Sequence, residues 1–286
     1  MKIGFIGLVI MGEAMSSNIV KKHNDKVYVF DFIEEKVNLL ASLGAVPCKS
    51  SLEVAKNSDL IITMVPKSEH SMAVYSEILD VLNDSKTCID MSTIDPKVSI
   101  EISKKVMSKG ARFIDAPVVK SKPAAIAGEL GIYVGCPSID IYNDIKDILS
   151  YMGNNIIYMG KNGNGLIMKI CHNTLVAQIQ NGVNETIALA TKNGIDIETY
   201  TKAISYGGGQ NFYLDSKNVA IKNKDYETAF SVENMAKDIG ICSRLLEENN
   251  MDMPGVDVVR NVYEKAIEMG FSKSDFCATI EVVKDK

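Results

Sequence analysis

Histidine is scarce in this chain of 286 residues, and its cysteines are scattered. There are only three histidines, and the six cysteines never form a Cys-x-x-Cys pair. Structural zinc sites need closely spaced Cys and His ligands, so the sequence predicts no metal site. Scattered cysteines are typical of a reducing compartment, and we therefore expect a cytoplasmic protein.

The chain also lacks an excess of positive charge and any long hydrophobic run. Its 31 Lys and Arg residues are outnumbered by 36 Asp and Glu residues, which gives a net charge of -5. This balance offers no positive field to a phosphate backbone, so we expect no nucleic-acid partner. No run is long enough to predict a membrane span. The apolar segment 3–11 is similar to the start of a signal peptide, but Glu13 interrupts it and a helix and a strand are predicted to follow.

Low-complexity tracts and internal repeats are missing as well. The composition, with 46% apolar and 23% charged residues, is that of an ordinary globular protein and not of a disordered one. At about 150 residues per domain, the length predicts about two domains, each large enough to bury its own core.

Short runs rich in valine and isoleucine alternate with helical stretches in the first part of the chain. Seven runs are strand candidates: 2–6, 26–30, 60–65, 87–90, 112–115, 130–135 and 155–159. Apolar strands separated by helical connections are typical of a parallel sheet that is covered on both faces. We therefore predict an α/β fold that begins with a Rossmann-type doubly wound parallel sheet.

The pattern changes after residue 163, close to a glycine-rich segment at 160–165 that breaks both periodicities. The stretch 166–193 reads as one long helix without proline, and further helical stretches cover 197–204, 229–249 and 256–269. The sequence therefore predicts a dinucleotide-binding domain at 1–163 and an all-helical substrate and oligomerisation domain at 164–286.

A glycine-containing turn follows the first predicted strand. Gly7 and Gly12 occupy the first and third positions of a G-x-G-x-x-G motif, but Val9 occupies the second. Such glycines allow a tight turn and a close approach of a pyrophosphate to a helix N-terminus. A side chain at Val9 would crowd that pyrophosphate, so the motif is weak on its own, and a glycine-lined turn of another α/β protein is the alternative.

Asp31 ends the second predicted strand. A carboxylate at this position accepts hydrogen bonds from the adenosine ribose hydroxyls and repels a 2′-phosphate. If a dinucleotide binds, NAD is therefore favoured over NADP, although aspartate is also common at the ends of strands.

The chain resembles the β-hydroxyacid dehydrogenase family, the group of 3-hydroxyisobutyrate dehydrogenases and tartronate semialdehyde reductases, which is related to 6-phosphogluconate dehydrogenase. The resemblance covers essentially the whole chain. It is carried by separated blocks in the right order: residues 4–8 with Met11-Gly12, Thr63-Met64-Val65-Pro66, residues 90–96, Asp115-Ala116-Pro117-Val118, residues 163–173, Phe230 and Lys237-Asp238.

The resemblance implies that Lys169 is the acid or base and that Asn173 holds the substrate. Helical spacing places both residues on one stripe of the long helix, together with Gln180 and Asn184. The alternative is a solvated helix face. Apolar neighbours on both sides of Lys169 favour a buried lysine, which needs a function or a partner.

The resemblance also implies a set of cofactor contacts. They are Gly7, Val9, Ile10, Met11 and Gly12 of the glycine turn, Asp31, Val65-Pro66 and Thr93 near the nicotinamide, and Lys237 from the helical domain. Without the resemblance, Val65-Pro66 could end a strand, Thr93 could cap a helix and Lys237 could lie on a solvated face.

One loop departs from the family. Where relatives have Ser-Gly-Gly after Ala-Pro-Val, this chain has Val119-Lys120-Ser121. The loop normally receives the substrate carboxylate, so these residues are candidate substrate contacts, and Lys120 could serve a different or larger acid. The alternative is a diverged surface loop. His172 is expected to pack rather than to bind metal.

We therefore expect an NAD-dependent dehydrogenase or reductase, with NADP disfavoured, that interconverts a small 3- or 4-hydroxy acid and its semialdehyde. The resemblance implies a homodimer or homotetramer built through the helical domain. Two alternatives remain open: a non-catalytic regulatory protein with a dinucleotide fold, motivated by Val9 and Val119-Lys120, and an imine reductase, which Lys169 disfavours.

Overall fold

The computed structural model describes residues 1–283. The chain divides into two compact units, Met1–Lys169 and a unit that begins at Ile170. The division falls inside a long helix, whereas the sequence placed the boundary just before that helix, at 163/164. Each unit has its own hydrophobic core.

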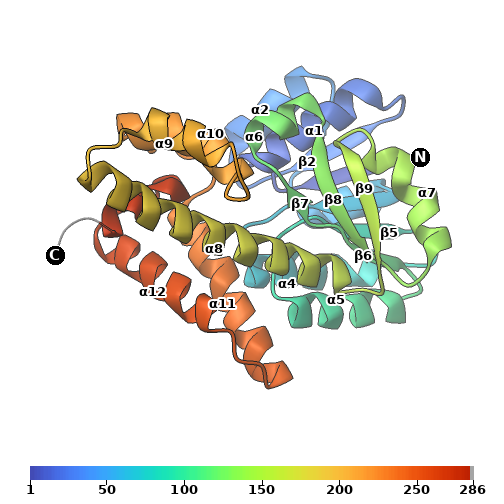
Figure 1. Cartoon of the computed structure of the whole chain (residues 1–286). Helices are drawn as coiled ribbons and strands as arrows, with labels where there is room; N and C mark the ends of the chain where they lie inside the picture. Colours follow the sequence, from blue (N-terminus) through green and yellow to red (C-terminus); the bar gives the residue numbers. More distant parts are fainter. Residues whose placement is uncertain (284–286) are drawn as a thin grey trace. The chain divides into compact units, whose positions relative to one another are not determined.

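The first unit is built on one sheet of nine strands (Figure 1). Its strands are β1 (Ile3–Ile6), β2 (Val27–Phe30), β3 (Val46–Pro47), β4 (Leu60–Thr63), β5 (Thr87–Asp90), β6 (Arg112–Asp115), β7 (Val118–Val119), β8 (Leu130–Gly135) and β9 (Gly153–Gly160). The order is β3-β2-β1-β4-β5-β6-β8-β7, with β9 paired to β8. The chain therefore reverses its direction of travel across the sheet between β1 and β4, where doubly wound folds bind ligands.

Alternation of side chains along the strands creates two cores, one on each face of the sheet. In β1, Ile3 and Phe5 belong to one core and Ile6 to the other, and in β4 the neighbours Ile61 and Ile62 are divided in the same way. Successive strand residues point to opposite faces, so a strand covered on both faces must be apolar throughout. This requirement explains the continuous Val and Ile runs.

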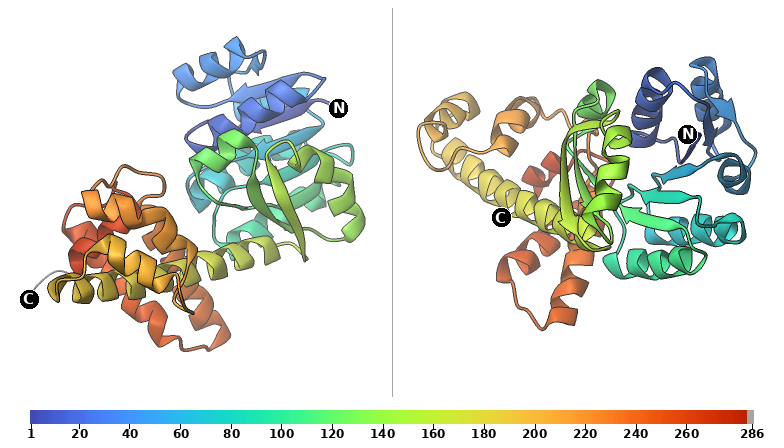
Figure 2. Two further views of the ribbon diagram at one scale, coloured as in Figure 1. Left: turned by 45° about the horizontal axis from the view of Figure 1, so that its top comes forward. Right: turned by 90° about the vertical axis from the view of Figure 1, so that its right-hand side faces the viewer.

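Helices cover both faces of this sheet, as the right-hand view of Figure 2 shows. Residues of α1 (Met11–Lys22), α2 (Glu34–Ser42), α6 (Lys122–Ala127) and α7 (Ile139–Leu149) pack into the first core. Residues of α3 (Ser51–Asn57), α4 (Ser68–Ile78) and α5 (Pro96–Ser108) pack into the second. A short 3₁₀ helix, η1 (Leu79–Val81), follows α4. The predicted Rossmann-type architecture is thus confirmed.

The last strands of the sheet differ from the prediction in direction. The pairs from β3 to β6 are parallel, but β8 runs antiparallel to β6 and to β7, and β9 runs parallel to β8. An apolar run predicts burial but carries no information about strand direction. The two-residue strands β3 and β7 were not predicted, because two residues are too few to show a periodicity.

The second unit is helical. It contains most of α8 (Asn164–Lys192), followed by α9 (Ile197–Ile204), α10 (Phe212–Asn223), α11 (Val232–Asn249), α12 (Pro254–Glu268) and the 3₁₀ helix η2 (Phe276–Val282). Helix α10 was not predicted, because its apolar and polar residues do not separate into clear faces. Of the helices in the described residues, even the 29-residue α8 does not combine the length and apolarity that crossing a membrane requires.

A buried ion pair fastens η2 to the rest of the helical unit. Asp275, which is fully buried, lies 2.9 Å from Lys217 Nζ of α10. Its carboxylate also accepts backbone N–H bonds from Ala229 and Phe230, and from Cys277 at the start of η2. A buried carboxylate is tolerated only when it is paired and hydrogen-bonded in this way.

Candidate active site

The carboxyl ends of four parallel strands meet at one edge of the sheet. Ile6, Thr63, Asp90 and Asp115 stand side by side in register, each as the last residue of its strand. The residues that follow them form the candidate cofactor site of the first unit, because ligands of doubly wound folds bind beyond these strand ends.

Two glycines shape the turn between β1 and α1. Gly7 has φ +95°, and a Cβ atom there would lie 2.2 Å from the Met64 carbonyl oxygen. A Cβ atom at Gly12 would lie 2.0 Å from the Gly7 carbonyl oxygen. Ile10 precedes α1 and has no polar side chain to cap it. The N–H of Gly12 donates to the Val9 carbonyl at 3.0 Å, and the helix N-terminus carries no side-chain cap that would compete with an anion. This cradle fits the pyrophosphate of a dinucleotide.

Val9 and Ile10 project from the same turn. Their side chains are 39% and 52% exposed, and the backbone of Ile10 has φ +48°. A β-branched residue rarely adopts positive φ, because its side chain then crowds the backbone. The turn that the sequence marked as unusual at Val9 is thus also strained at Ile10, and Met11 follows as the first residue of α1.

Asp31 is fixed by two backbone N–H groups at the end of β2. Its Oδ2 atom accepts from Leu8 at 2.6 Å, and its Oδ1 atom accepts from Ile33 at 2.8 Å. Each carboxylate oxygen can accept a further bond, so the group can still receive ribose hydroxyls. Glu34 and Glu35 follow in the first turn of α2. The end of β2 and the start of α2 are therefore acidic.

Hydrogen bonds connect the loops that follow β4 and β5. The backbone N–H of Val65 donates to Ser92 Oγ at 2.9 Å, and the N–H of Ser92 donates to Asp90 Oδ1 at 3.0 Å. Burial raises the pKa of Asp90. Val65 and Thr93 are half-buried at this edge, and Pro66 is exposed. Ser92 was not singled out from the sequence, although it stands beside Thr93 in a matching block.

The loop Val119–Ser121, whose sequence differs from that of the family, has a buried part and an exposed part. Val119 is only 8% exposed in β7 and packs over Gly131, where an added Cβ atom would lie 2.5 Å from Val119 Cγ2. Lys120 is exposed and has φ +77°, a conformation that favours glycine. Ser121 is half-buried in front of α6. Lys120 is therefore the charged group that this loop presents.

The predicted catalytic lysine is buried. Lys169 lies in α8 with 7% of its surface exposed, which agrees with a special environment and not with a solvated helix face. Asn173 follows four residues later, about one helical turn, and is 5% exposed.

In the helical unit, Asn173 and Lys237 meet at a carboxylate. Asn173 Nδ2 donates to Asp238 Oδ2 at 2.6 Å, and Lys237 Nζ lies 3.4 Å from Asp238 Oδ1. Asp238 is 1% exposed. Sequence reasoning missed its role, and the available signal was its place next to Lys237 in a matching block.

The other polar residues predicted on this helix stripe hold the fold together. Gln180 receives the Tyr263 hydroxyl and donates to the Phe276 carbonyl, while Asn184 receives the Tyr213 hydroxyl and donates to Thr279. Both amides are fully buried. Their hydrogen bonds connect α8 to α10, α12 and η2, so they belong to the core and not to the candidate active site.

Neither a metal-binding cluster nor a disulfide is present in the described residues. Residues 1–283 contain no cluster of three or more His, Cys, Asp or Glu side chains that could hold a metal ion. His172 is half-buried on α8. All six cysteines lie in the described residues and are free thiols.

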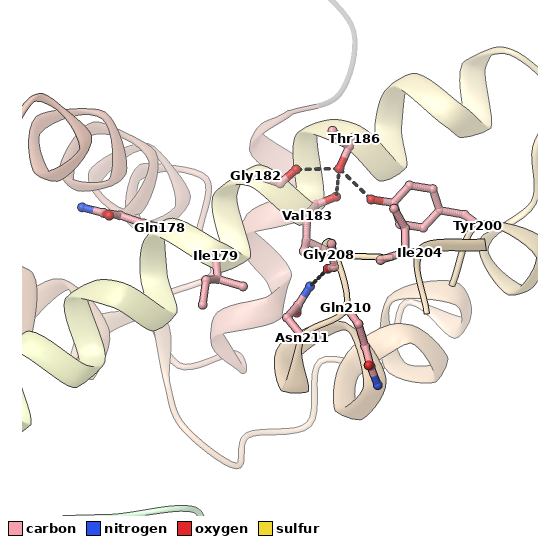
Figure 3. Close-up of a pocket in the computed structure, with 11 residues that line it drawn as sticks. Gln178, Ile179, Gly182, Val183, Thr186, Tyr200, Ile204, Gly208, Gln210 and Asn211 are labelled. Carbon is pink, nitrogen blue, oxygen red and sulfur yellow. Dashed lines mark hydrogen bonds between the residues drawn. The ribbon is translucent and has the colours of Figure 1, made fainter. Parts of the chain in front are cut away.

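A cavity of about 680 Å³ lies elsewhere in the helical unit (Figure 3). Ile179 and Thr186 of α8 line it together with Tyr200 of α9 and the glycine loop around Gly208. Thr186 Oγ1 and the Tyr200 hydroxyl lie 2.7 Å apart there. None of the described residues that line this cavity is a predicted site residue, so it is distinct from the groups considered above.

Comparisons with known proteins agree with this geometry. Residues 2–160 match the family model of the NAD-binding domain of 6-phosphogluconate dehydrogenase. Residues 163–283 match the model described as NAD-binding of NADP-dependent 3-hydroxyisobutyrate dehydrogenase.

Individual relatives match over almost the full chain. The mitochondrial 3-hydroxyisobutyrate dehydrogenase of Drosophila melanogaster is 34% identical, over 99% of this chain and 89% of that protein. The glyoxylate/succinic semialdehyde reductase 1 of Arabidopsis thaliana is 31% identical, over 99% of both chains. The structure of Mycobacterium tuberculosis 3-hydroxyisobutyrate dehydrogenase with L-serine superposes with a TM-score of 0.92 at 26% identity, over 99% of both chains. The chain therefore belongs to the β-hydroxyacid dehydrogenase family and is an oxidoreductase that depends on a nicotinamide dinucleotide.

Proposed function

We propose that this enzyme interconverts a small 3- or 4-hydroxy acid and its semialdehyde, with NAD as the preferred cofactor and Lys169 as the proton donor and acceptor. The burial of Lys169 carries the proposal, because a lysine that is 7% exposed in a dehydrogenase needs a specific role. Two of the substrates in the names of the fly and plant relatives, 3-hydroxyisobutyrate and succinic semialdehyde, belong to these two classes of acid, whereas glyoxylate, which is also named, does not.

The chemistry separates into a hydride and a proton. The nicotinamide supplies or accepts the hydride. When the semialdehyde is reduced, negative charge develops on its oxygen, and the ammonium group of Lys169 donates a proton there. In the oxidation, the neutral amine accepts the hydroxyl proton. Exclusion of water around a buried lysine strengthens both interactions.

Asn173 orients the substrate. One N–H of its amide is committed to Asp238, which fixes the rotation of the amide plane. An amide of fixed orientation distinguishes a hydrogen-bond acceptor of the substrate, such as a carboxylate oxygen, from a donor, such as a hydroxyl. It therefore restricts how the acid binds. Lys237 lies at the other oxygen of Asp238. We assign Lys237 to the cofactor, as the resemblance implies.

The first unit supports the assignment of NAD. The turn formed by Gly7, Val9, Ile10, Met11 and Gly12 receives the pyrophosphate, and Val65, Pro66 and Thr93 border the nicotinamide. Asp31 accepts the ribose hydroxyls. The carboxylates of Asp31, Glu34 and Glu35 at the end of β2 and the start of α2 would repel a 2′-phosphate.

The loop Val119–Ser121 supports a proposal about the kind of acid that binds. Lys120 holds an exposed ammonium group in a backbone conformation that glycine adopts more easily. We assign it to the substrate carboxylate, with Ser121 beside it and Val119 supporting the loop from β7. A longer acid, or one with a second carboxylate, matches an ammonium group on a long side chain.

Turnover of a panel of semialdehydes with NADH tests the function. We expect activity with at least one four-carbon semialdehyde, and Lys169→Met should lower kcat by about a thousandfold, within the range that general acid catalysis and charge stabilisation contribute together. Lys192→Met, in the last turn of the same helix, is the matched control and should leave kcat unchanged. Full activity of Lys169→Met would exclude the proposed role.

Assembly and location complete the proposal. We propose a homodimer or homotetramer that buries one face of α8, on which Leu175 and Leu189 are 58% and 65% exposed. Leu175→Glu with Leu189→Glu should then shift the mass measured by light scattering to that of a monomer.

We also propose a cytoplasmic location, which six free thiols support. Fractionation of the source cells tests it.

A further inference from the structure

A fully buried carboxylate stands at the carboxyl end of β6 and has no part in the chemistry proposed above. Asp115 is 0% exposed. It is the register neighbour of Asp90 in β5. The two side chains serve different loops, because Asp90 accepts from Ser92 in the following loop, whereas Asp115 reaches a segment almost fifty residues further along the chain.

The carboxylate of Asp115 binds the start of α8. Its Oδ1 atom accepts the backbone N–H of Gly163 at 2.7 Å, and its Oδ2 atom accepts the N–H of Leu166 at 3.1 Å. These groups belong to the turn before α8 and to its first helical turn, where N–H groups lack partners within the helix. A negative charge at this end is also favoured by the helix dipole.

Neighbouring glycines leave room for this carboxylate and for nothing larger. A Cβ atom at Gly135 of β8 would lie 2.5 Å from Asp115 Oδ1. A Cβ atom at Gly165 of α8 would lie 2.9 Å from Asp115 Oδ2 and 2.5 Å from the Tyr133 carbonyl oxygen. The first turn of α8 therefore lies directly against the end of β6, in a position that small changes would disturb.

Lys169 comes one helical turn after this anchored segment. It lies four residues beyond Gly165 and three beyond Leu166, and a helix transmits a displacement of its first turn to the next. Burial raises the pKa of Asp115 to about 6, while the N–H groups of Gly163 and Leu166 lower it. At neutral pH the group is therefore a carboxylate that can accept both bonds.

We propose that Asp115 is a positioning residue for the reaction: its carboxylate fixes the first turn of α8 and thereby sets the place of the Lys169 ammonium group. The inference rests on the proposed role of Lys169. It assigns Asp115 no contact with substrate or cofactor.

The test replaces Asp115 with asparagine, which keeps the size of the side chain but can accept only one of the two N–H bonds. We expect Asp115→Asn to lower kcat at least tenfold, while the Kd of NADH, measured by titration, stays within twofold of the native value. Tyr142→Phe is the matched control, because it removes a different, partly buried hydrogen bond of this unit, from the Tyr142 hydroxyl to the Ile156 carbonyl. It should lower the Tm and leave kcat unchanged.

Each of the other possible results overturns either the positioning role of Asp115 or the proposed function. A kcat of Asp115→Asn within twofold of native, with Lys169→Met inactive, overturns the positioning role and leaves the proposed function intact. Full activity of Lys169→Met removes the proposed function itself. An equal loss of kcat and of NADH affinity indicates general damage and also overturns the proposal.

Loss of folding has its own test. If Asp115→Asn does not fold, Gly165→Ala displaces the first turn of α8 without removing the carboxylate, and it should lower kcat at least tenfold with NADH affinity retained. A folded Gly165→Ala with native kcat overturns the proposal. Failure of both variants to fold also overturns it, because the contact would then determine stability and not the position of Lys169.

Discussion

Asn173 and Asp238 share a hydrogen bond of 2.6 Å between helices α8 and α11, and both side chains are almost completely buried. The donor is the amide nitrogen and the acceptor is a carboxylate oxygen. The pair therefore turns an ordinary amide into a group of fixed orientation. Lys237 at the second carboxylate oxygen adds a positive charge that the buried Asp238 requires.

Removing this carboxylate should impair substrate binding and turnover. In Asp238→Ala, the amide of Asn173 loses a charged hydrogen bond of about 1.5 to 3 kcal/mol, and Lys237 loses its counter-charge. We expect kcat/KM for the semialdehyde to fall about tenfold to a hundredfold, as measured by steady-state kinetics. Asp257→Ala, which removes an exposed ion pair with Arg260 on α12, should leave kcat/KM unchanged. Native kinetics of Asp238→Ala would contradict this assignment.

The choice between NAD and NADP should depend on Asp31. In Asp31→Ala the ribose hydroxyls lose a charged acceptor and a 2′-phosphate meets less repulsion, so the ratio of kcat/KM for NADH over NADPH should fall at least tenfold, for a charged hydrogen bond of about 1.5 kcal/mol or more. The substitution also frees the N–H of Leu8. Asp31→Asn separates these effects, because it retains an acceptor for Leu8 without the charge. A native enzyme that used both cofactors equally would refute the prediction.

Replacing Val9 with glycine should strengthen cofactor binding. The side chain is exposed on the turn that we assign to the pyrophosphate, so its removal should let the phosphates approach the backbone. We expect the Kd of NADH to fall about tenfold, a change of about 1.4 kcal/mol. Ile10→Gly is the comparison: it relieves the positive φ of Ile10 and should raise stability by about 1 kcal/mol. Unchanged or weaker NADH binding by Val9→Gly would count against crowding.

The stability of the protein should depend on pH through Asp115. Its pKa is raised from 3.8 to about 6 in the folded protein, mainly because burial disfavours the charged form. Protonation of Asp115 therefore stabilises the folded protein by about 3 kcal/mol in total. This stabilisation is fully present below about pH 4 and is lost as the pH rises through about 6. The thiol of Cys136 is the titratable neighbour, and burial also raises its pKa.

Asp115→Asn isolates this effect, because asparagine does not titrate. The free energy of unfolding of the native protein, measured with urea at pH 4 and at pH 7, should fall relative to that of the variant as the pH rises. A difference between the two proteins that is constant over this range would show that Asp115 has an ordinary pKa.

The sequence predicts the fold well where one periodicity dominates. The seven longer strands and the long helix α8 are confirmed. The apolar runs of β1, β2 and β4 follow from burial on both faces of the parallel part of the sheet. The reversed direction of β8 was not predictable, because direction depends on pairing with β6 and β7 and not on composition. Asn211 caps α10 through a hydrogen bond to Leu214, a local signal that could have revealed this helix.

The residues of the candidate site also differ in how far the sequence predicts them. The sequence predicts Gly7 and Gly12 from their short spacing around one turn, and Asp31 from its position after the second strand. The sequence shows Asp115 and Asp238 only as members of matching blocks. Their hydrogen-bonding roles were not predictable, because each has a partner 48 or more residues away in the chain. Val119 was a candidate substrate contact, and the structure shows it buried in β7, a placement that depends on its approach to Gly131.

The two cores on either side of the sheet make the length of each strand as important as its composition. Ile61 and Ile62 serve opposite cores, so deleting one residue from β4 would exchange their sides and invert every later residue of that strand. Thr63, which ends β4, would then turn away from the Tyr75 hydroxyl that it now meets at 3.1 Å. Natural variants of this enzyme should therefore tolerate insertions between strands and helices far better than within the strands that lead to the site.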